Sequence, residues 1–155
     1  MISELCAELH NYFLRDYTRP EQYIHSGSFV IAGGEMQSLP FLKENQYYRI
    51  VGSTFNDGVY QYHDPDRSRE AGPLTNESFD GAIWEMFVPP DVIALANEIE
   101  TWISDNADTI NSPYQSESFG GYSYTKAVAG TGELSTTWQS HFASRLNRWR
   151  RTKEL

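Results

Sequence analysis

Residues 116–126 form a segment that is predicted to be extended but has no evident pairing partner in its own chain. From Tyr122 onward the side chains alternate, with Tyr122, Tyr124, Lys126 and Val128 on one face and Ser123, Thr125, Ala127 and Ala129 on the other. A period of two is typical of a half-buried strand. Glycines at 120–121, 130 and 132 flank this strand, so no tight hairpin ties it to a neighbour. The sequence therefore predicts an arm that reaches another molecule.

The length and composition indicate one globular body. A chain of 155 residues can bury a core without disulfides or metals, and its 14% aromatic content favours strands and interfaces over a purely helical bundle. The single cysteine, Cys6, cannot form an internal disulfide, and we find neither a secretory segment nor an apolar run of transmembrane length. We expect a soluble protein made in a reducing cytoplasm, with no membrane partner.

Charge is distributed unevenly along the chain. Residues 1–144 hold seven Lys and Arg against twenty Asp and Glu, a net charge of −13, whereas residues 145–155 carry +4. An acidic body argues against wrapping nucleic acid, because phosphate contacts need Lys and Arg. The basic end could dock onto an acidic partner, or its arginines could simply complement the dipole at a helix C-terminus. Both interpretations stay open at this point.

The expected order of elements is helix, strands, helix, arm, helix. Apolar residues at helical spacing predict helices within 1–18, 89–107 and 134–151, the first reaching about residue 15 and the second covering about 90–105. Between them, residues 23–88 read as a β-rich insertion, and residues 111–133 as the extended arm. The predicted fold class is α+β: one domain over 1–155 with a small three-helix core, an inserted antiparallel β-hairpin subdomain and an extended C-terminal arm.

Two hairpins are predicted inside the β-rich insertion. Gly33-Gly34 separates the short apolar stretches 28–32 and 35–37, and Asp57-Gly58 separates residues 46–54 from 59–62. Residues 63–81 are polar and are punctuated by proline and glycine, which predicts a long surface excursion with little core. A last strand is expected at 82–88.

No pattern in the sequence indicates catalysis. The four histidines lie at 10, 25, 63 and 141 without metal-ligand spacing, and Cys6 lies in the apolar stripe of the first predicted helix, where a buried, inert thiol is expected. The run His63-Asp64-Pro65-Asp66 could bind a cation loosely, but a solvated acidic turn is the favoured interpretation. We predict no catalytic, metal-binding or cofactor-binding residues, and a protein that is not an enzyme.

The C-terminal third of the chain resembles a known family. Ser116-Glu-Ser-Phe-Gly-Gly-Tyr-Ser-Tyr-Thr125, followed by a short helix ending in Leu146-Asn-Arg-Trp-Arg-Arg151, is similar to the head-tail connector (head-completion or adaptor) proteins of tailed phages. The resemblance covers about residues 112–151, and the predicted helix from Val92 to Ile103 also looks like the family's helix before its arm. The chain departs from the family upstream, where the β-rich segment resembles extended versions found in phages and prophages of Gram-positive bacteria.

This resemblance implies a structural role in the virion neck, with assembly in the bacterial cytoplasm. Family members form a ring, for which the resemblance implies twelve copies, under the portal of a DNA-filled capsid, and a neck, stopper or tail-terminator protein joins below. The arm embraces the adjacent copy, the C-terminal segment docks into the portal, and DNA passes through the channel without specific binding. The partner-binding residues implied are Ser116, Glu117, Ser118, Phe119, Tyr122, Ser123, Tyr124, Lys126, Arg145, Arg148, Trp149, Arg150 and Arg151.

Two other function classes compete with this one. A soluble β-rich module that binds carbohydrate or peptide would account for the aromatic residues and hairpins, but it has no need of an arm and a basic terminus. A small hydrolase would need converging histidines and carboxylates, of which the order of the chain gives no hint.

Overall fold

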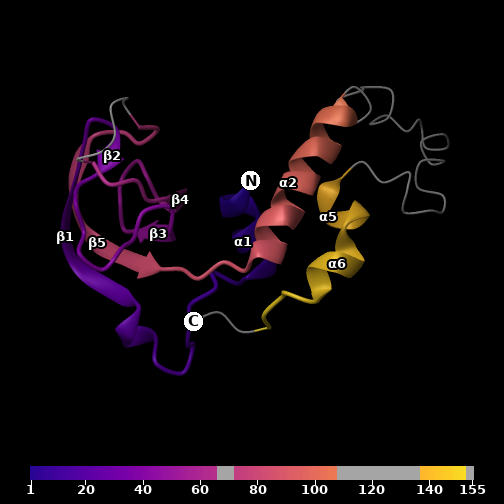
Figure 1. Cartoon of the computed structure of the whole chain (residues 1–155), viewed down its shortest axis with the longest axis horizontal. Helices are drawn as coiled ribbons and strands as arrows, with labels where there is room; N and C mark the ends of the chain where they lie inside the picture. Colours follow the sequence, from indigo (N-terminus) through magenta and orange to yellow (C-terminus); the bar gives the residue numbers. More distant parts are fainter. Residues whose placement is uncertain (66–71, 108–136, 153–155) are drawn as a thin grey trace. The chain divides into compact units, whose positions relative to one another are not determined.

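A computed structural model describes residues 1–65, 72–107 and 137–152 (Figure 1). The chain divides into two compact units. One unit is built from Met1, Ser3–Asn11 and the residues from Pro90 onward, and the other from Tyr12–Pro89. We call them the helical unit and the sheet unit and describe each by itself.

The helical unit contains α1 (Ile2–Leu9), α2 (Pro90–Asp105), α5 (Trp138–His141) and α6 (Ala143–Asn147). Helix α2 has Pro at its first position, where the missing N–H costs no hydrogen bond. Thr137 caps α5, and its hydroxyl accepts a hydrogen bond from the Ser140 amide. The apolar faces are buried, and the fully or almost fully covered side chains are Leu5, Cys6, Leu9, Val92, Leu95, Ala96, Ile99 and Leu146.

Helix α1 is shorter than predicted. His10 adopts a left-handed conformation with φ 52°, and the amides of His10 and Asn11 bond back to the carbonyls of Ala7 and Cys6. These bonds satisfy the last carbonyls of the helix, so it ends at Leu9 and not near residue 15. The predicted C-terminal helix is likewise broken, at Phe142, into α5 and α6. The prediction for α2 over about 90–105 is confirmed.

The sheet unit is a five-stranded antiparallel sheet in the order β2-β1-β5-β3-β4. The strands are β1 (Ile24–Ala32), β2 (Glu35–Met36), β3 (Tyr47–Val51), β4 (Gly58–Gln61) and β5 (Glu77–Glu85), and a 3-10 turn at Pro20–Gln22 precedes them. Both predicted hairpins are confirmed, because β1 pairs with β2 across Gly33-Gly34 and β3 pairs with β4 across the turn that ends at Asp57.

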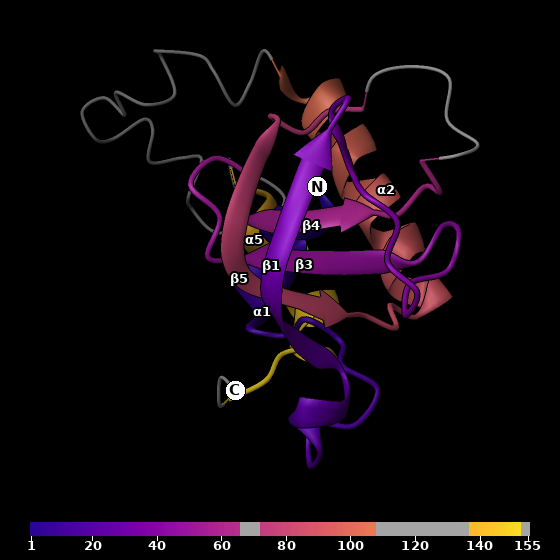
Figure 2. The same ribbon diagram turned by 90° about the vertical axis from the view of Figure 1, so that its left-hand side faces the viewer.

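The sheet curls into a half-barrel. In Figure 2, β3 and β4 run across the direction of β1, and β5 bends so that its second half runs beside β3. The two long strands have glycines opposite each other, Gly27 and Gly81, and a Cβ on Gly81 would lie 2.2 Å from the carbonyl oxygen of Val51. The close approach of β3 to β5 therefore requires glycine there. The curled sheet encloses a core of ten buried residues: Phe29, Ile31, Met36, Leu42, Tyr48, Ile50, Tyr62, Leu74, Phe79 and Ile83.

The predicted fold class is wrong. The described chain is dominated by a curled five-stranded antiparallel sheet with short helices, and it is not a three-helix core carrying a β-hairpin. The reason is the pairing of β1 with β5 over residues 24–31 and 77–84, which joins the two local hairpins into one sheet. Residues 77–81, expected in a polar excursion, form the first half of β5, and Phe79 is in the core.

Candidate partner-binding surfaces

The basic C-terminal segment packs against its own helical unit. Arg145, in the last turn of α6, bonds to the Glu98 carboxylate of α2, with one nitrogen–oxygen distance of 3.2 Å and a second, shorter contact. These hydrogen bonds lower the pKa of Glu98 and raise that of Arg145. In this unit α2 also contacts the N-terminal amine, which lies 3.5 Å from a Glu100 carboxylate oxygen. The first of the predicted docking arginines is therefore already paired within the chain.

Residues 149–151 are fastened to α1. The Asn11 side-chain amide donates to the Trp149 carbonyl at 2.9 Å, and the Arg151 amide donates to the Leu9 carbonyl at 2.9 Å. The Arg150 guanidinium donates to both the carboxylate and the main-chain carbonyl of Glu8, at 2.8 and 2.7 Å. The end of the described chain thus caps the C-terminal end of α1, whose last carbonyls attract donors and cations.

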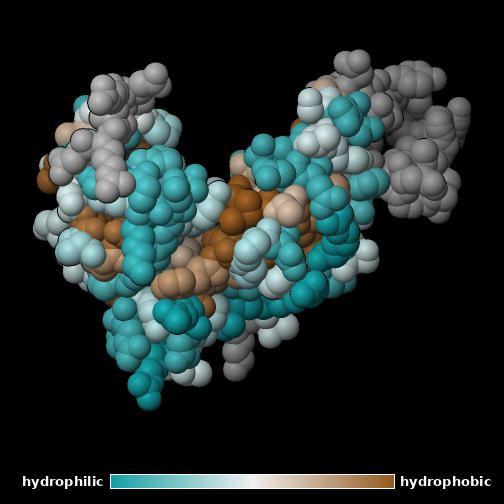
Figure 3. Space-filling view, viewed as in Figure 1, coloured by the Kyte–Doolittle hydropathy of each residue, from teal (hydrophilic) through white to brown (hydrophobic). Residues whose placement is uncertain are grey.

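Arg148 differs from its neighbours. Its side chain is exposed, and its guanidinium lies 4.6 Å from the centre of the Trp149 ring. Stacking of this kind holds the cation in place while leaving its N–H groups available. In the view of Figure 3 the surface over α5 and α6 is largely hydrophilic. Among the predicted docking residues that the structure describes, Arg148 with Trp149 is therefore the pair best presented to a partner.

The predicted arm residues, from Ser116 to Lys126, lie outside the described residues. The elements on either side of the undescribed stretch 108–136 are in contact: Trp102 of α2 stacks on His141 of α5 at 4.7 Å and meets Phe142 edge-on at 6.1 Å. The described elements that flank this stretch in the sequence therefore pack against each other.

In the sheet unit a braced turn presents an exposed aromatic side chain. Phe55, in the turn between β3 and β4, is 67% exposed, while Asn56 beside it is 3% exposed. The Asn56 side-chain nitrogen donates to the Thr75 carbonyl and the Glu77 carboxylate, and its side-chain oxygen accepts from the Thr75 main-chain amide, at 2.6–2.8 Å. Glu77 also accepts from the Ser53 hydroxyl and the amides of 54 and 55, and these hydrogen bonds, the hydroxyl first, lower its pKa. Phe55 is therefore held in place by its neighbours.

The turn-forming residues Asn56-Asp57-Gly58 predict this turn, but nothing in the sequence identifies Glu77 as the residue whose hydrogen bonds hold it. Glu77 lies about twenty residues away in a stretch that was expected to be a loop. Phe55 was accordingly not among the predicted partner-binding residues.

A cleft of about 460 Å³ opens elsewhere in the sheet unit. Its aromatic walls are Tyr23, Phe41 and Phe87, and its charged groups include Arg15, Lys43, Glu44 and Glu85. Arg15 lies over the Phe87 ring at 5.3 Å, and Tyr23 meets Phe87 edge-on. Glu85 is 2.6 Å from His25, whose ring stacks on Phe41. The volume is within the range of small-ligand sites, and the charges of both signs are already partly engaged with neighbours.

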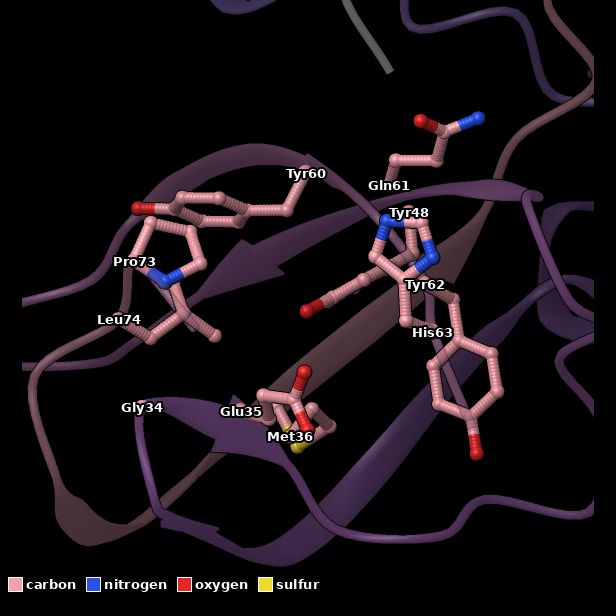
Figure 4. A pocket seen from close by; sticks show the side chains of 10 residues that line it. All are labelled: Gly34, Glu35, Met36, Tyr48, Tyr60, Gln61, Tyr62, His63, Pro73 and Leu74. Carbon is pink, nitrogen blue, oxygen red and sulfur yellow. The ribbon is translucent and has the colours of Figure 1, made fainter. Parts of the chain in front are cut away.

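A second cavity is too small for a ligand. It measures about 30 Å³ and lies between β2, β3, β4 and residues 73–74. Figure 4 shows Tyr48 pointing across it toward Glu35 and Met36, with Tyr60 beside Pro73. Tyr48 is 2% exposed, and burial raises the pKa of its phenol. The space would accommodate about one water molecule, so it belongs to the core.

Within residues 1–65, 72–107 and 137–152, no three His, Cys, Asp or Glu side chains are grouped so as to hold a metal ion. Over the same residues, no helix combines the length and the apolar character needed to cross a membrane. Cys6 is buried, as predicted.

No protein family, curated protein or solved structure matches the chain.

Proposed function

We propose that this protein is a head-tail adaptor of a tailed phage: a structural protein, not an enzyme, that forms a ring under the portal and joins the DNA-filled capsid to the neck. The observation that carries the proposal is the similarity of residues 112–151 to that family, from Ser116-Glu-Ser through Tyr122-Ser to the final Arg148-Trp-Arg-Arg151. A strand with unsatisfied edges gains main-chain hydrogen bonds by adding to a neighbour.

The helical unit supports the proposal in two ways. Helices α2 and α5, between which the predicted arm lies in the sequence, contact each other directly, so an arm that binds another molecule does not have to separate them. In addition, Arg145 and Arg150 hold the C-terminal segment on the unit, which leaves the Arg148–Trp149 pair to face a portal. Arginine and tryptophan are the residue types that most often dominate binding energy at interfaces.

The acidic body has a role in this proposal. The net charge of −13 over residues 1–144 would repel DNA if the acids face the channel, and the genome could then pass without adhering. A ring whose acids lie on the outer rim would rule out this part of the proposal.

The test is assembly with the portal. The wild-type chain, mixed with its portal, should give a ring seen by electron microscopy, while a variant lacking residues 115–129, rejoined by a short Gly-Ser linker, should fold but form no ring. The contact between α2 and α5 makes rejoining feasible. Normal ring formation by the deletion variant would contradict the assigned role of the arm, and global unfolding would show that the stretch belongs to the core.

A second candidate function, a carbohydrate- or peptide-binding module, is favoured by the aromatic cleft alone. Sugars and peptides stack on side chains such as Tyr23, Phe41 and Phe87 and bond to adjacent charged groups. A ligand-dependent rise in melting temperature without any oligomer, lost in Phe41→Ala, would favour this candidate over the adaptor.

A further inference from the structure

Strand β1 has one open edge. Its pairing with β5 covers residues 24–31, but its pairing with β2 covers only Ile31 and Ala32, with one more bond from the Gln37 amide to the Val30 carbonyl. Within the part of the chain that the structure describes, residues 24–29 therefore pair with a strand on one side only. Ser26, Gly27 and Ser28 are exposed, so this edge is open to solvent.

The hydrogen-bond pattern shows which backbone groups the open edge presents. The Glu85 amide bonds to the Tyr23 carbonyl, so in this antiparallel ladder the odd residues of β1 bond toward β5. The even residues face the other way, as the bond to the Val30 carbonyl confirms. The N–H and C=O groups of Ser26 and Ser28 thus point outward, and among the described residues none supplies them with a backbone partner. Such an edge is a template for another strand.

The two faces beside this edge differ. Phe29 points into the core, and on that side Phe41 stacks on His25 at 3.7 Å, so little room is left. On the outer face lie Ser28, whose hydroxyl bonds to the Asp80 carboxylate, and Val30, which is 48% exposed. A strand that fits here needs small side chains inward and larger ones, with a cation, outward.

The arm has this composition. In the strand that the sequence predicts over 122–129, Ser123, Thr125, Ala127 and Ala129 form a face of small side chains, and the other face carries two tyrosines, Lys126 and Val128. Lys126 is the only charged residue between 122 and 129. Beside Ser28 it would be about two strand spacings, or roughly 10 Å, from the Asp80 backbone, which is within the combined reach of a Lys and an Asp side chain.

We infer that the open edge of β1, at Ser26–Ser28, receives the strand Tyr122–Ala129 of an adjacent copy, with Lys126 paired to Asp80. The inference rests on the proposed function for the choice of a second copy as the donor. Each copy gives one strand and receives one, so the contact is heterologous and repeats around a closed ring.

Disulfide trapping tests the pairing directly. Copies carrying Ser28→Cys are mixed with copies carrying Tyr124→Cys, Lys126→Cys or Val128→Cys, both as the concentrated free chain and on the portal. Cys6 is fully buried and does not compete. A disulfide between the two kinds of copy is expected for at least one of the three positions. Thr54→Cys, an exposed position on the turn after β3, serves as the matched acceptor control and should give none.

Two outcomes would overturn the inference. One is the absence of any such disulfide in both settings. The other concerns the double variant Ser28→Cys/Lys126→Cys at high dilution. If a disulfide forms only within one chain there, residues 122–129 pair with β1 of the same copy and not with that of a neighbour.

Ring assembly provides a second readout. Ser26→Pro removes the outward N–H at an edge position where proline is tolerated, and Ser26→Ala keeps that N–H. We expect at least a tenfold loss of assembly for the proline variant and none for alanine. If the proline variant does not fold, Asp80→Lys and Lys126→Asp decide: each alone should weaken assembly, and the double exchange should restore it.

The two proposals fail separately. Rings on the portal that form normally with Ser26→Pro and show no disulfide would leave the adaptor function standing and remove the β1 edge as the acceptor. Disulfides between copies of a chain that never binds a portal would support the β1 edge as the acceptor and remove the adaptor function.

Discussion

Reversing the charge of Arg150 should destabilise the helical unit, whereas the same change at Arg148 should weaken docking alone. The Arg150 guanidinium donates to the Glu8 carboxylate at 2.8 Å and to the Glu8 carbonyl at 2.7 Å, with both side chains about one-third exposed (33% and 30%). Arg148 is exposed and lies over the Trp149 ring.

The magnitude follows from these contacts. A partly exposed ion pair contributes about 0.5–1 kcal/mol, and the bond to the carbonyl about 1 kcal/mol more. Placing a glutamate at 150 next to Glu8 adds repulsion of about 1 kcal/mol. Arg150→Glu should therefore lower the free energy of unfolding by about 2–3 kcal/mol, which in a chain of this size lowers Tm by roughly 5–10 °C. Arg148→Glu loses only an exposed stacking contact of about 0.5–1 kcal/mol.

Calorimetry and a portal-binding assay separate the two effects. Arg148→Glu should melt close to the wild type and bind the portal at least tenfold more weakly. Arg19→Glu, an exposed change of the same charge in the sheet unit, is the control for net charge. The reasoning would be refuted if Arg150→Glu melted like the wild type, or if Arg148→Glu bound the portal normally while losing as much stability as Arg150→Glu.

Three further predictions concern the sheet unit. Asn56→Ala should cost about 2–4 kcal/mol in a denaturant titration, because it removes the hydrogen bonds that the buried Asn56 side chain makes to the Thr75 main chain and the Glu77 carboxylate. Phe55→Ala, at an exposed position, should cost under about 1 kcal/mol. Equal costs would argue against the role of Asn56 in holding the turn. The pKa of Glu77 is below its ordinary value of 4.5, so the contribution of this carboxylate to folding stability is present above that pH and is lost as the pH falls through the folded-state pKa. Glu77→Gln should therefore make the melting temperature fall less steeply in acid. An unchanged slope would contradict the stabilising role of the Glu77 carboxylate. Gly81→Ala should prevent β3 from pairing normally with β5, visible as loss of near-ultraviolet circular dichroism, and a native spectrum would show that the close approach can relax.

Local signals predicted the local structure of this protein. The glycine pair at 33–34 and the Asp57-Gly58 pair fix two hairpins because their turn conformations depend on the residues in the turn itself. Pro90 and the apolar spacing that follows it fix α2 in the same way. The helix over 1–18 was overestimated because its end depends on the left-handed His10 and the main-chain bonds around it.

The overall fold depended on contacts between distant residues. Ile24-His-Ser-Gly-Ser28 and Glu77-Ser-Phe-Asp-Gly81 are polar and glycine-containing, so neither reads as a strand alone. They become strands because they pair with each other, about fifty residues apart, and Phe29 and Phe79 then face one core. The same holds for the candidate partner-binding surface. The basic segment is evident in the sequence, but the pairing of Arg145 and Arg150, and not of Arg148, depends on the distant Glu98 and Glu8.

The most direct test of the central proposal is electron microscopy of the full chain mixed with its portal protein. The adaptor function predicts a closed ring of copies, coaxial with the portal, with the Arg148–Trp149 pair at the contact between them. A chain that remains monomeric and unbound at concentrations where the portal ring is intact would contradict it.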